Sequence, residues 1–457
     1  MERHTIDLSQ GTIWKQIARF ALPLLVGNLF QQLYNTVDTI VVGRYVGKVQ
    51  LAAVGSMGNA INALIGFFMG LATGASVIIS QYRGAHNDKR LSDSVQTTVA
   101  LSLIACVFCT IAGNLAIPLL LKMLKIHPGD DVYPYAVDYL RIYFTGICGM
   151  LIYNIGAGIL RAVGDSKRPL YFLCVSALLN VGLDLLFVMG FKMEVKGVAY
   201  ATVISQAVSA CLVLIVLTRS HTPYAIKWKK LAIDRQILSG ILKIGLPTAV
   251  QSAITSISNV FVQGYINAFK ADCMAGWTAY GRIDQFALLP VSSLALSSTT
   301  FVGQNLGAGN MERAKKGCNV ALLMCAVICV VMAIPMMLFA PNLIGIFNSD
   351  PEVLRYGSIF LRMMSPFYTL CALNQIYAGV LRGAGVSTPP TVIMLASFVA
   401  FRQLYLFVCS RLFDSFRVVA LAYPMGWILC SILMLIYYYR ADWESKSTVL
   451  SREKQRA

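Results

Sequence analysis

The sequence predicts an all-α polytopic membrane protein with twelve transmembrane helices, arranged as two six-helix parallel repeats, an N-lobe and a C-lobe, around a central cleft. Three observations lead to this prediction. Of the 457 residues, 57% are hydrophobic and only 13% are charged, whereas soluble domains carry about 25% charged residues. Long apolar segments recur along the whole chain, and a helix needs about 20 such residues to cross a bilayer. Motifs of the first half also return in the second half.

Twelve apolar segments are long enough to be spans. In chain order they cover approximately residues 16–42, 52–81, 95–121, 137–160, 169–190, 197–218, 239–268, 274–304, 318–341, 355–381, 390–410 and 418–439. The polar stretch before the first span (MERHTIDLSQGTIWK) has no apolar h-region, so we expect no signal peptide there. With a cytoplasmic N-terminus, most of the 38 Lys and Arg fall on the inner side, which is the positive-inside pattern. We therefore expect a multi-pass protein of the cell (cytoplasmic or inner) membrane, with both termini cytoplasmic.

Three pairs of motifs indicate an internal duplication. QYRGAHNDKR at 81–90 resembles QNLGAGNMER at 304–313 (offset 223), LRAVGDSKRP at 160–169 resembles LRGAGVSTPP at 381–390 (offset 221), and Pro23 corresponds to Pro247 (offset 224). Six spans per half is an even number, so both halves enter the membrane from the same side. This predicts an N-lobe (1–217), a cytoplasmic linker between the lobes (218–238), a C-lobe (239–440) and a cytoplasmic tail (441–457).

Charge and reactive side chains exclude several classes of protein. The net charge of +17 follows the predicted membrane orientation, so it does not indicate a nucleic-acid partner. The twelve cysteines lie almost entirely within spans and the four histidines outside them, and a buried free cysteine behaves as a small apolar residue. We find no HExxH motif and no loop large enough for a catalytic domain. We therefore expect no metal site, no resident cofactor and no enzymatic activity.

Carboxylates inside the spans are the strongest functional signal. A charged side chain at the centre of a membrane helix costs about 2.5–3.5 kcal/mol even on the lenient insertion scale, yet Asp38, Asp184 and Asp284 lie in spans. Asn180 and Asp184 are four residues apart and share one helix face. Counted from the span ends at about 1.5 Å per residue, Asp38, Asp184 and Thr202 lie at a similar depth.

Two carboxylates beside amide and hydroxyl oxygens suit a small cation. Such a pair can share a proton near neutral pH or ligate a small hard cation. Hydrogen bonding between helices, without any ion, is the structural alternative. The repeat offsets place Val262 and Tyr405 at the positions of Asp38 and Asp184, so this chemistry is predicted for the first half alone. Arg282 lies two residues from Asp284, so the two do not face each other on a helix.

Four motifs together resemble the multidrug and toxic compound extrusion (MATE) family, and its DinF/MepA-like branch in particular. They are LPLLVGNLFQQLYNTVDTIVVGRYVG at the first span, LRAVGDSKRP after the fourth, NVGLDLLFV in the fifth and VGQNLGAGNMERAKK after the eighth. The resemblance covers essentially the whole chain. It implies a secondary antiporter, with both lobes in membrane lipid, that exports amphipathic or cationic organic compounds in exchange for H⁺ or Na⁺. We expect a monomer.

The resemblance also implies roles for particular residues. It assigns cation coupling to Asp38, Asp184, Asn180, Thr202, Asn154 and Tyr139, with any Na⁺ held by the first four. The implied substrate cavity between the lobes has as candidates Gln31, Tyr34, Asn35, Met57, Gln251, Gln263, Tyr280 and Asp284. NorM-like relatives carry cation-binding acids in the C-half. The corresponding spans here carry Gln251, Asn259, Gln263 and Asn374, so a sodium site is not expected there.

A lipid or lipid-linked oligosaccharide flippase of the same superfamily is the alternative function. Such a protein is expected to have a more cationic cavity, because it must hold a pyrophosphate. Here Arg282 and Arg402 are the only arginines placed deep in the second half, and Arg141 lies near a span end. Binding of a dye against binding of a lipid pyrophosphate separates the two functions.

Overall fold

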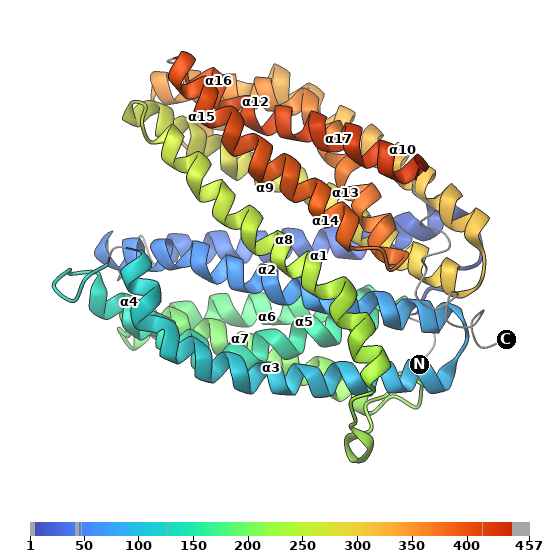
Figure 1. The fold of residues 1–457 in the computed structure, drawn as a ribbon. Coiled ribbons are helices and arrows are strands. Elements are labelled where there is room, and N and C mark those ends of the chain that lie inside the picture. Colours follow the sequence, from blue (N-terminus) through green and yellow to red (C-terminus); the bar gives the residue numbers. More distant parts are fainter. Residues whose placement is uncertain (1–4, 42–44, 47, 125, 414, 441–457) are drawn as a thin grey trace. The chain divides into compact units, whose positions relative to one another are not determined.

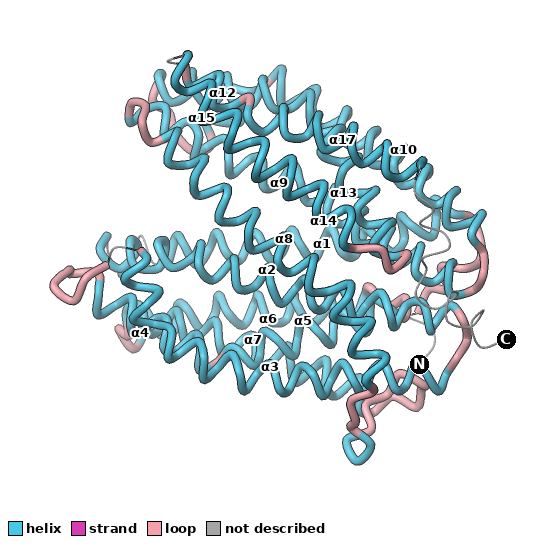
Figure 2. Tube along the Cα trace, in the orientation of Figure 1, coloured by secondary structure: helices cyan, strands magenta, loops and turns pink. Residues whose placement is uncertain are grey.

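The computed structural model describes residues 5–41, 45–46, 48–124, 126–413 and 415–440, and within this part helices are the only regular secondary structure (Figure 2). In α1 and α2 the side chains of residues 35, 38–41, 48–56, 58–60 and 62–63 are not described. The described chain is therefore a set of helices joined by short turns, as the sequence predicts.

Each half of the chain forms a series of helices. The first half contains α1 (Ile13–Val41), α2 (Lys48–Gly84), α3 (Asp88–Met123), α4 (Tyr133–Thr145), α5 (Ile147–Ala162), α6 (Lys167–Leu185), the π-helical turn η3 (Leu186–Gly190), α7 (Glu194–Thr218) and the 3₁₀ turn η4 (Trp228–Lys230). The second half contains α8 (Arg235–Ile266), α9 (Ala271–Gly307), α10 (Met311–Leu338), α11 (Ala340–Gly345), α12 (Pro351–Met364), η5 (Ser365–Phe367), α13 (Tyr368–Gly383), α14 (Thr388–Leu395), η6 (Ala396–Phe401), α15 (Arg402–Leu412), α16 (Phe416–Ala420) and α17 (Ala422–Arg440).

The twelve predicted spans each coincide with one of these helices or with two or three consecutive ones. Among the described residues, nine helices are long and apolar enough to cross a membrane, or ten when α4 and α5, which bend by 46°, count as one span. Helix α1 and the broken α12–η5–α13 segment, which carries charged residues on α12, supply the remaining two. The prediction of an all-α, twelve-span membrane protein is confirmed.

The chain folds into two compact units, and each unit is formed by two separate stretches of the chain. Unit 1 comprises the chain up to Asp7 together with Val26–Gly245, and unit 2 comprises Leu8–Leu25 together with the chain from Leu246 onward. Within unit 1, α2, α3, α5, α6 and α7 pack on one another, and within unit 2, α9, α10, α12, α13 and α17 do so (Figure 1). Helices α1 and α8 therefore each begin in one unit and end in the other, and each carries a proline, Pro23 or Pro247, within two residues of the division.

In unit 2, polar contacts hold the stretch that leads into α1. The Arg313 guanidinium donates to the backbone oxygen of Gln10 at 2.8 Å and to that of Leu8 at 3.4 Å. Asn305 also donates to the Leu8 oxygen, at 3.1 Å, and Gln304 accepts from the Leu8 backbone nitrogen at 3.1 Å. Residues of the repeat motif QNLGAGNMER therefore hold the backbone of residues 8–10.

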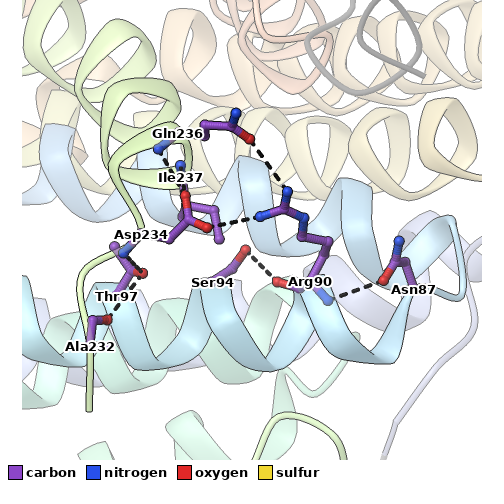
Figure 3. Close-up of polar contacts among 8 residues, drawn as sticks. All are labelled: Asn87, Arg90, Ser94, Thr97, Ala232, Asp234, Gln236 and Ile237. Carbon is purple, nitrogen blue, oxygen red and sulfur yellow. Dashed lines mark hydrogen bonds and ion pairs between the residues drawn. The ribbon is translucent and has the colours of Figure 1, made fainter. Parts of the chain in front are cut away.

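In unit 1, the corresponding arginine holds the stretch that leads into α8. Arg90 corresponds to Arg313 by the offset of 223. Its guanidinium donates to the Asp234 carboxylate at 2.8 Å and to Gln236 at 3.3 Å (Figure 3). Each repeat thus uses the same motif arginine to fix the lead-in of the other repeat's first helix.

The same close contact between two helices occurs within each unit. In unit 1 the Ser76 hydroxyl of α2 donates to the Gly158 oxygen of α5 at 3.1 Å, and in unit 2 the Thr299 hydroxyl of α9 donates to the Gly379 oxygen of α13 at 3.0 Å. A Cβ on Gly379 would lie 2.6 Å from the Ala295 backbone oxygen. Small residues allow such close approach where membrane helices pack. This matched contact supports the predicted duplication.

We expect Gly379→Ala to lower the free energy of unfolding by about 1–3 kcal/mol, because its methyl group overpacks the contact between α13 and α9. The measurement is thermal unfolding of the detergent-solubilised protein. Gly281→Ala on α9 is the matched control, since a Cβ there would have nothing within 4 Å. Equal loss of stability in both variants would show that the close contact does not constrain the packing.

Candidate functional site

Helix α6 carries the two most deeply buried polar candidates. Asn180 and Asp184 are 1% and 0% exposed and lie one helical turn apart. The helix begins at Lys167, within the LRAVGDSKRP motif, where Asp165 accepts from the backbone nitrogens of Lys167 and Arg168 at 3.2 and 3.1 Å. This acidic cap satisfies the free amide groups of the first turn, so the motif fixes where α6 starts.

The contact between α6 and α7 brings Thr202 into the same layer. The Ser176 hydroxyl donates to the Ser205 backbone oxygen at 2.9 Å, and α7 returns antiparallel to α6 after the short connection that follows η3. One turn beyond Ser176 on α6 is Asn180, which therefore lies level with Thr202 on α7. By the same count, Asp184 lies level with Val198, whose backbone oxygen accepts from the Thr202 hydroxyl at 3.0 Å.

Helix α1 reaches this layer as well. Val37 packs against Val188 of η3 and Val198 of α7, so the backbone of the next residue, Asp38, lies beside the same two elements. The side chains of Asp38 and of the cavity candidate Asn35 are outside the described part of the structure. Asn180, Asp184 and Thr202 therefore lie on α6 and α7 within two successive helical turns, and α1 packs beside the same elements through Val37.

The amide of Asn180 is the exceptional group of this layer. Both its nitrogen and its oxygen are buried, and neither forms a hydrogen bond with any residue that the structure describes. A buried amide without a partner costs about 1–3 kcal/mol, more than a typical hydrogen bond contributes. The layer therefore has hydrogen-bonding and ligating capacity that its neighbours, as described, do not use.

The two outlying candidates take different places. Gly149 approaches Ala207, and Gly156 approaches Val213, so α5 runs alongside α7 in the same direction and Asn154 lies about nine residues, roughly 14 Å, from the level of Thr202. The Asn154 amide donates to the Met150 oxygen of its own helix at 2.9 Å. Asn154 is not brought to the layer.

Tyr139 on α4 lies nearer. The neighbouring Asp138 pairs with Lys196, near the start of α7, at 3.2 Å, which places Tyr139 close to the level of Asp184. Its ring stacks on Tyr143 with centroids 6.3 Å apart. It belongs to an apolar cluster that also contains the fully buried Met57. Met57, a candidate for the cavity, is therefore a core residue of unit 1, whereas Gln31 is exposed and Tyr34 half-buried on α1.

In unit 2 the corresponding helix carries a fixed positive charge. Arg402 is only 3% exposed. It comes one residue after Phe401, which corresponds to Asn180 by the offset of 221. Its guanidinium donates to the Ser258 hydroxyl at 2.7 Å and to the Asn259 side-chain oxygen at 2.9 Å on α8. It also lies over the Tyr423 ring, 4.7 Å from the centroid. Buried Val262, which replaces Asp38, is one turn beyond Ser258 on α8.

The polar candidates of the second half are bonded within unit 2. Asp284 accepts from the hydroxyls of Tyr280 at 2.9 Å and Tyr368 at 2.7 Å. The remaining candidates bond as follows: Asn374 with the Trp427 oxygen (3.1 Å) and the Ser431 hydroxyl (3.0 Å), Gln251 with the Met394 sulfur (3.2 Å) and the Thr391 hydroxyl (3.4 Å), and Gln263 with Asn267 (2.8 Å). Sequence reasoning missed Tyr368 and Ser258, because only the fold shows which hydroxyls lie beside an intramembrane charge.

We expect Arg402→Leu to lower the free energy of unfolding by about 1–3 kcal/mol, because it removes the donor to the Asn259 side-chain oxygen and one of the two donors to the buried Ser258 hydroxyl, whose other donor is the Gln403 amide. Thermal unfolding in detergent measures the effect. Arg411→Leu, an exposed position near the end of the same helix, should change stability much less. A stable Arg402→Leu protein would show that the guanidinium does not hold α8 to α15.

Comparison with known proteins identifies similar chains over almost the full length. The family model described as MatE matches twice, over residues 23–186 and 247–405, so the two matches begin 224 residues apart, in agreement with the duplication. The chain is 27% identical over 444 residues to the probable multidrug resistance protein YpnP of Bacillus subtilis (strain 168), covering 96% of this chain and 98% of that protein. It is 21% identical over 409 residues to the multidrug export protein MepA of Staphylococcus haemolyticus (strain JCSC1435), covering 88% of each.

A solved structure has the same fold. It is described as the outward-facing conformation of a multidrug resistance MATE family transporter of the MOP superfamily, and it superposes with a TM-score of 0.89 at 25% identity, covering 94% of this chain and 96% of that chain.

Proposed function

The chain belongs to the MatE family of multi-pass membrane transporters, and from this premise we propose that it is a secondary active antiporter. It exports amphipathic or cationic organic compounds, drugs among them, in exchange for H⁺ or Na⁺. The names of its relatives, multidrug resistance and multidrug export proteins, support the substrate class. The proposed location is the cell membrane with both termini cytoplasmic, because the basic residues are concentrated on that side.

The single observation that carries the coupling proposal is the buried polar layer of unit 1. Asn180 on α6 is buried level with Thr202 on α7, Asp184 is buried one turn further along α6, and the Asn180 amide has no hydrogen-bond partner among the described residues. Intramembrane acids are functional by default, since their burial is costly. With Asp38 on α1, this layer offers two carboxylates, one amide oxygen and one hydroxyl oxygen, which suit a proton or a Na⁺.

Ion binding at this layer changes the charge felt by α1. With both acids ionised, Asp38 and Asp184 repel each other, and a proton or Na⁺ removes that repulsion. Helix α1 then shifts within unit 1, closes the pocket of the N-lobe and displaces the organic substrate outward. The ion drives this change only to the extent that it binds one arrangement of α1 more tightly than the other.

Unit 2 supports an asymmetric mechanism. Arg402 places a permanent positive charge at the corresponding helix, and Val262 and Tyr405 stand where the acids would be. A fixed guanidinium cannot be exchanged during a transport cycle, so coupling is assigned to the N-lobe alone. The same contacts weaken the flippase alternative, because Arg402 is bonded to Ser258 and Asn259 and so is not available for a pyrophosphate.

We expect Asp184→Asn and Asp38→Asn each to abolish gradient-driven export while preserving folding and substrate binding, because the amide keeps the shape but fixes the position as neutral. The double variant should be scarcely worse than either single one, since residues that act as a unit are not additive. The measurement is transport in proteoliposomes with pH and sodium gradients imposed separately, which also identifies the ion.

Asp138→Asn is the matched control for these variants. Asp138 is an acid of the same unit that pairs with Lys196 at a partly exposed position, so its removal should leave gradient-driven export near the parental rate. Export by Asp184→Asn at the parental rate would mean that the buried acid is structural and that coupling lies elsewhere.

We expect Val262→Ile and Tyr405→Phe to leave the ion dependence of transport unchanged, because these side chains replace coupling groups instead of supplying them. Their expression and thermal stability are measured alongside the proteoliposome assay. A lost ion response at normal expression would extend the coupling machinery into the second half.

A further inference from the structure

The linker between the repeats is fixed to α3 at two places. At the first, the Gln96 amide donates to the Ala225 oxygen at 2.9 Å and accepts from the Lys227 backbone nitrogen at 3.1 Å. At the second, the Thr97 hydroxyl donates to the Ala232 oxygen at 3.4 Å and accepts from the Asp234 backbone nitrogen at 3.1 Å (Figure 3). The backbone between these places is therefore held in a defined position on unit 1.

The negative charge of Asp234, the one acid of the linker, is already balanced within the protein. Asp234 accepts from the backbone nitrogens of Ile237 and Gln236 at 3.0 and 2.8 Å. These hydrogen bonds, that of Ile237 first, together with Arg90 lower the pKa of the Asp234 carboxyl, against the effect of its partial burial. The carboxylate is thus ionised at neutral pH, and Arg90, 2.8 Å away, balances its charge.

Three lysines stand between the two fixed places. Lys227, Lys229 and Lys230 are exposed, and none of them forms an ion pair with a residue in the described part of the chain. Residues 218–236 contain five basic side chains and one acid, and that acid is paired with Arg90. The linker therefore presents an unbalanced positive charge on a rigid backbone.

An apolar crevice of unit 1 opens beside these lysines. It holds about 320 Å³ of empty space, its open mouth included, between α3, α5, α7 and the linker. Its walls include Leu103, Ile155 and Leu214. Trp228 also lines it, is 45% exposed, and donates from its ring nitrogen to the Thr218 hydroxyl at 3.1 Å. Indole rings of this kind lie preferentially at the level of lipid headgroups.

We propose that this crevice and the three lysines form a binding site for one anionic glycerophospholipid of the cytoplasmic leaflet. Part of one acyl chain lies against the mouth of the apolar crevice, and the phosphate lies beside Trp228, where Lys227, Lys229 and Lys230 balance its charge. Basic residues next to a membrane helix attract anionic lipids in this way. The inference is independent of the coupling ion and of the exported compound.

The chemistry of the site selects this occupant over two others. A soluble anion such as inorganic phosphate has no apolar part that could cover the walls of the crevice. An acyl chain can cover them, and the burial of apolar surface favours its binding. A cationic organic substrate would meet three like charges at the mouth, which disfavours it. Only an amphipathic anion matches both the apolar walls and the basic rim.

Brominated lipids test the site, because bromine on an acyl chain quenches a neighbouring tryptophan. The parent protein and Trp228→Phe are reconstituted with chain-brominated phosphatidylglycerol or chain-brominated phosphatidylcholine, and the difference between the two proteins gives the quenching at Trp228. We expect phosphatidylglycerol to quench at a concentration lower by about tenfold or more, since the three lysines attract its anionic headgroup and not the zwitterionic headgroup of phosphatidylcholine. Equal quenching by the two lipids would overturn the proposal.

Two sets of variants separate the headgroup from the chain. The variant K227Q/K229Q/K230Q should lose the preference, and K227R/K229R/K230R should retain it. The control K122Q/K192Q/K270Q removes three exposed lysines elsewhere and should retain the preference as well. An equal loss in this control would show that the preference reflects only overall charge.

Leu103→Phe/Ile155→Phe fills the crevice. It should weaken the binding of long-chain phosphatidylglycerol to the level of the dihexanoyl form, whose chains are too short to use the crevice. Unchanged long-chain binding in that variant would exclude the crevice.

Discussion

A polar group buried in a membrane-spanning helix must find its partner inside the protein, because lipid offers none. Most of this structure follows from that constraint. The Ser76 and Thr299 hydroxyls bond to backbone oxygens of neighbouring helices, Arg402 bonds to α8, and Asp284 bonds to two tyrosines. Several buried polar atoms lack a partner among the described residues, and in the Asn180 amide both the nitrogen and the oxygen do. Such a group beside a buried acid needs an explanation, and a bound ligand is the one we propose.

Duplication gave two copies of one scaffold, and the copies now hold charge in opposite ways. Both units keep the contact at Gly158 or Gly379 and the motif arginine at 90 or 313. The helix that carries Asp184 in unit 1 carries Arg402 in unit 2. In the proposed mechanism an exchangeable ion balances the acid at this place, whereas a guanidinium bonded to Ser258 is a permanent part of the packing. On that proposal one unit responds to a gradient while the other keeps its shape.

The sequence predicted the twelve spans because each is a long apolar run, and it predicted the shared face of Asn180 and Asp184 because that spacing is local. Counting from Gly190 and Gly197 gave Thr202 the depth of Asp184, whereas the register of α6 and α7 puts it one turn away, level with Asn180. It did not predict the bend at Gly146, the π-helical turns η3 and η6, or the partners of Asp284 and Arg402. The partners of Asp284 and Arg402 include residues far away in the sequence, such as Tyr368 for Asp284 (84 apart) and Ser258 for Arg402 (144 apart), which no local pattern encodes.

The exchange of half-helices between the units sets an order for biogenesis. Residues 8–25 are synthesised before all of unit 1 from Val26 onward, yet they belong to unit 2, whose other helices run from Leu246 to α17. Arg313 and Asn305, which hold the backbone at Leu8, are synthesised about 300 residues later. Domains usually fold in the order of their synthesis. Here residues 8–25 must wait in the membrane until the rest of unit 2 has been made, so unit 2 cannot be completed before unit 1 has been synthesised.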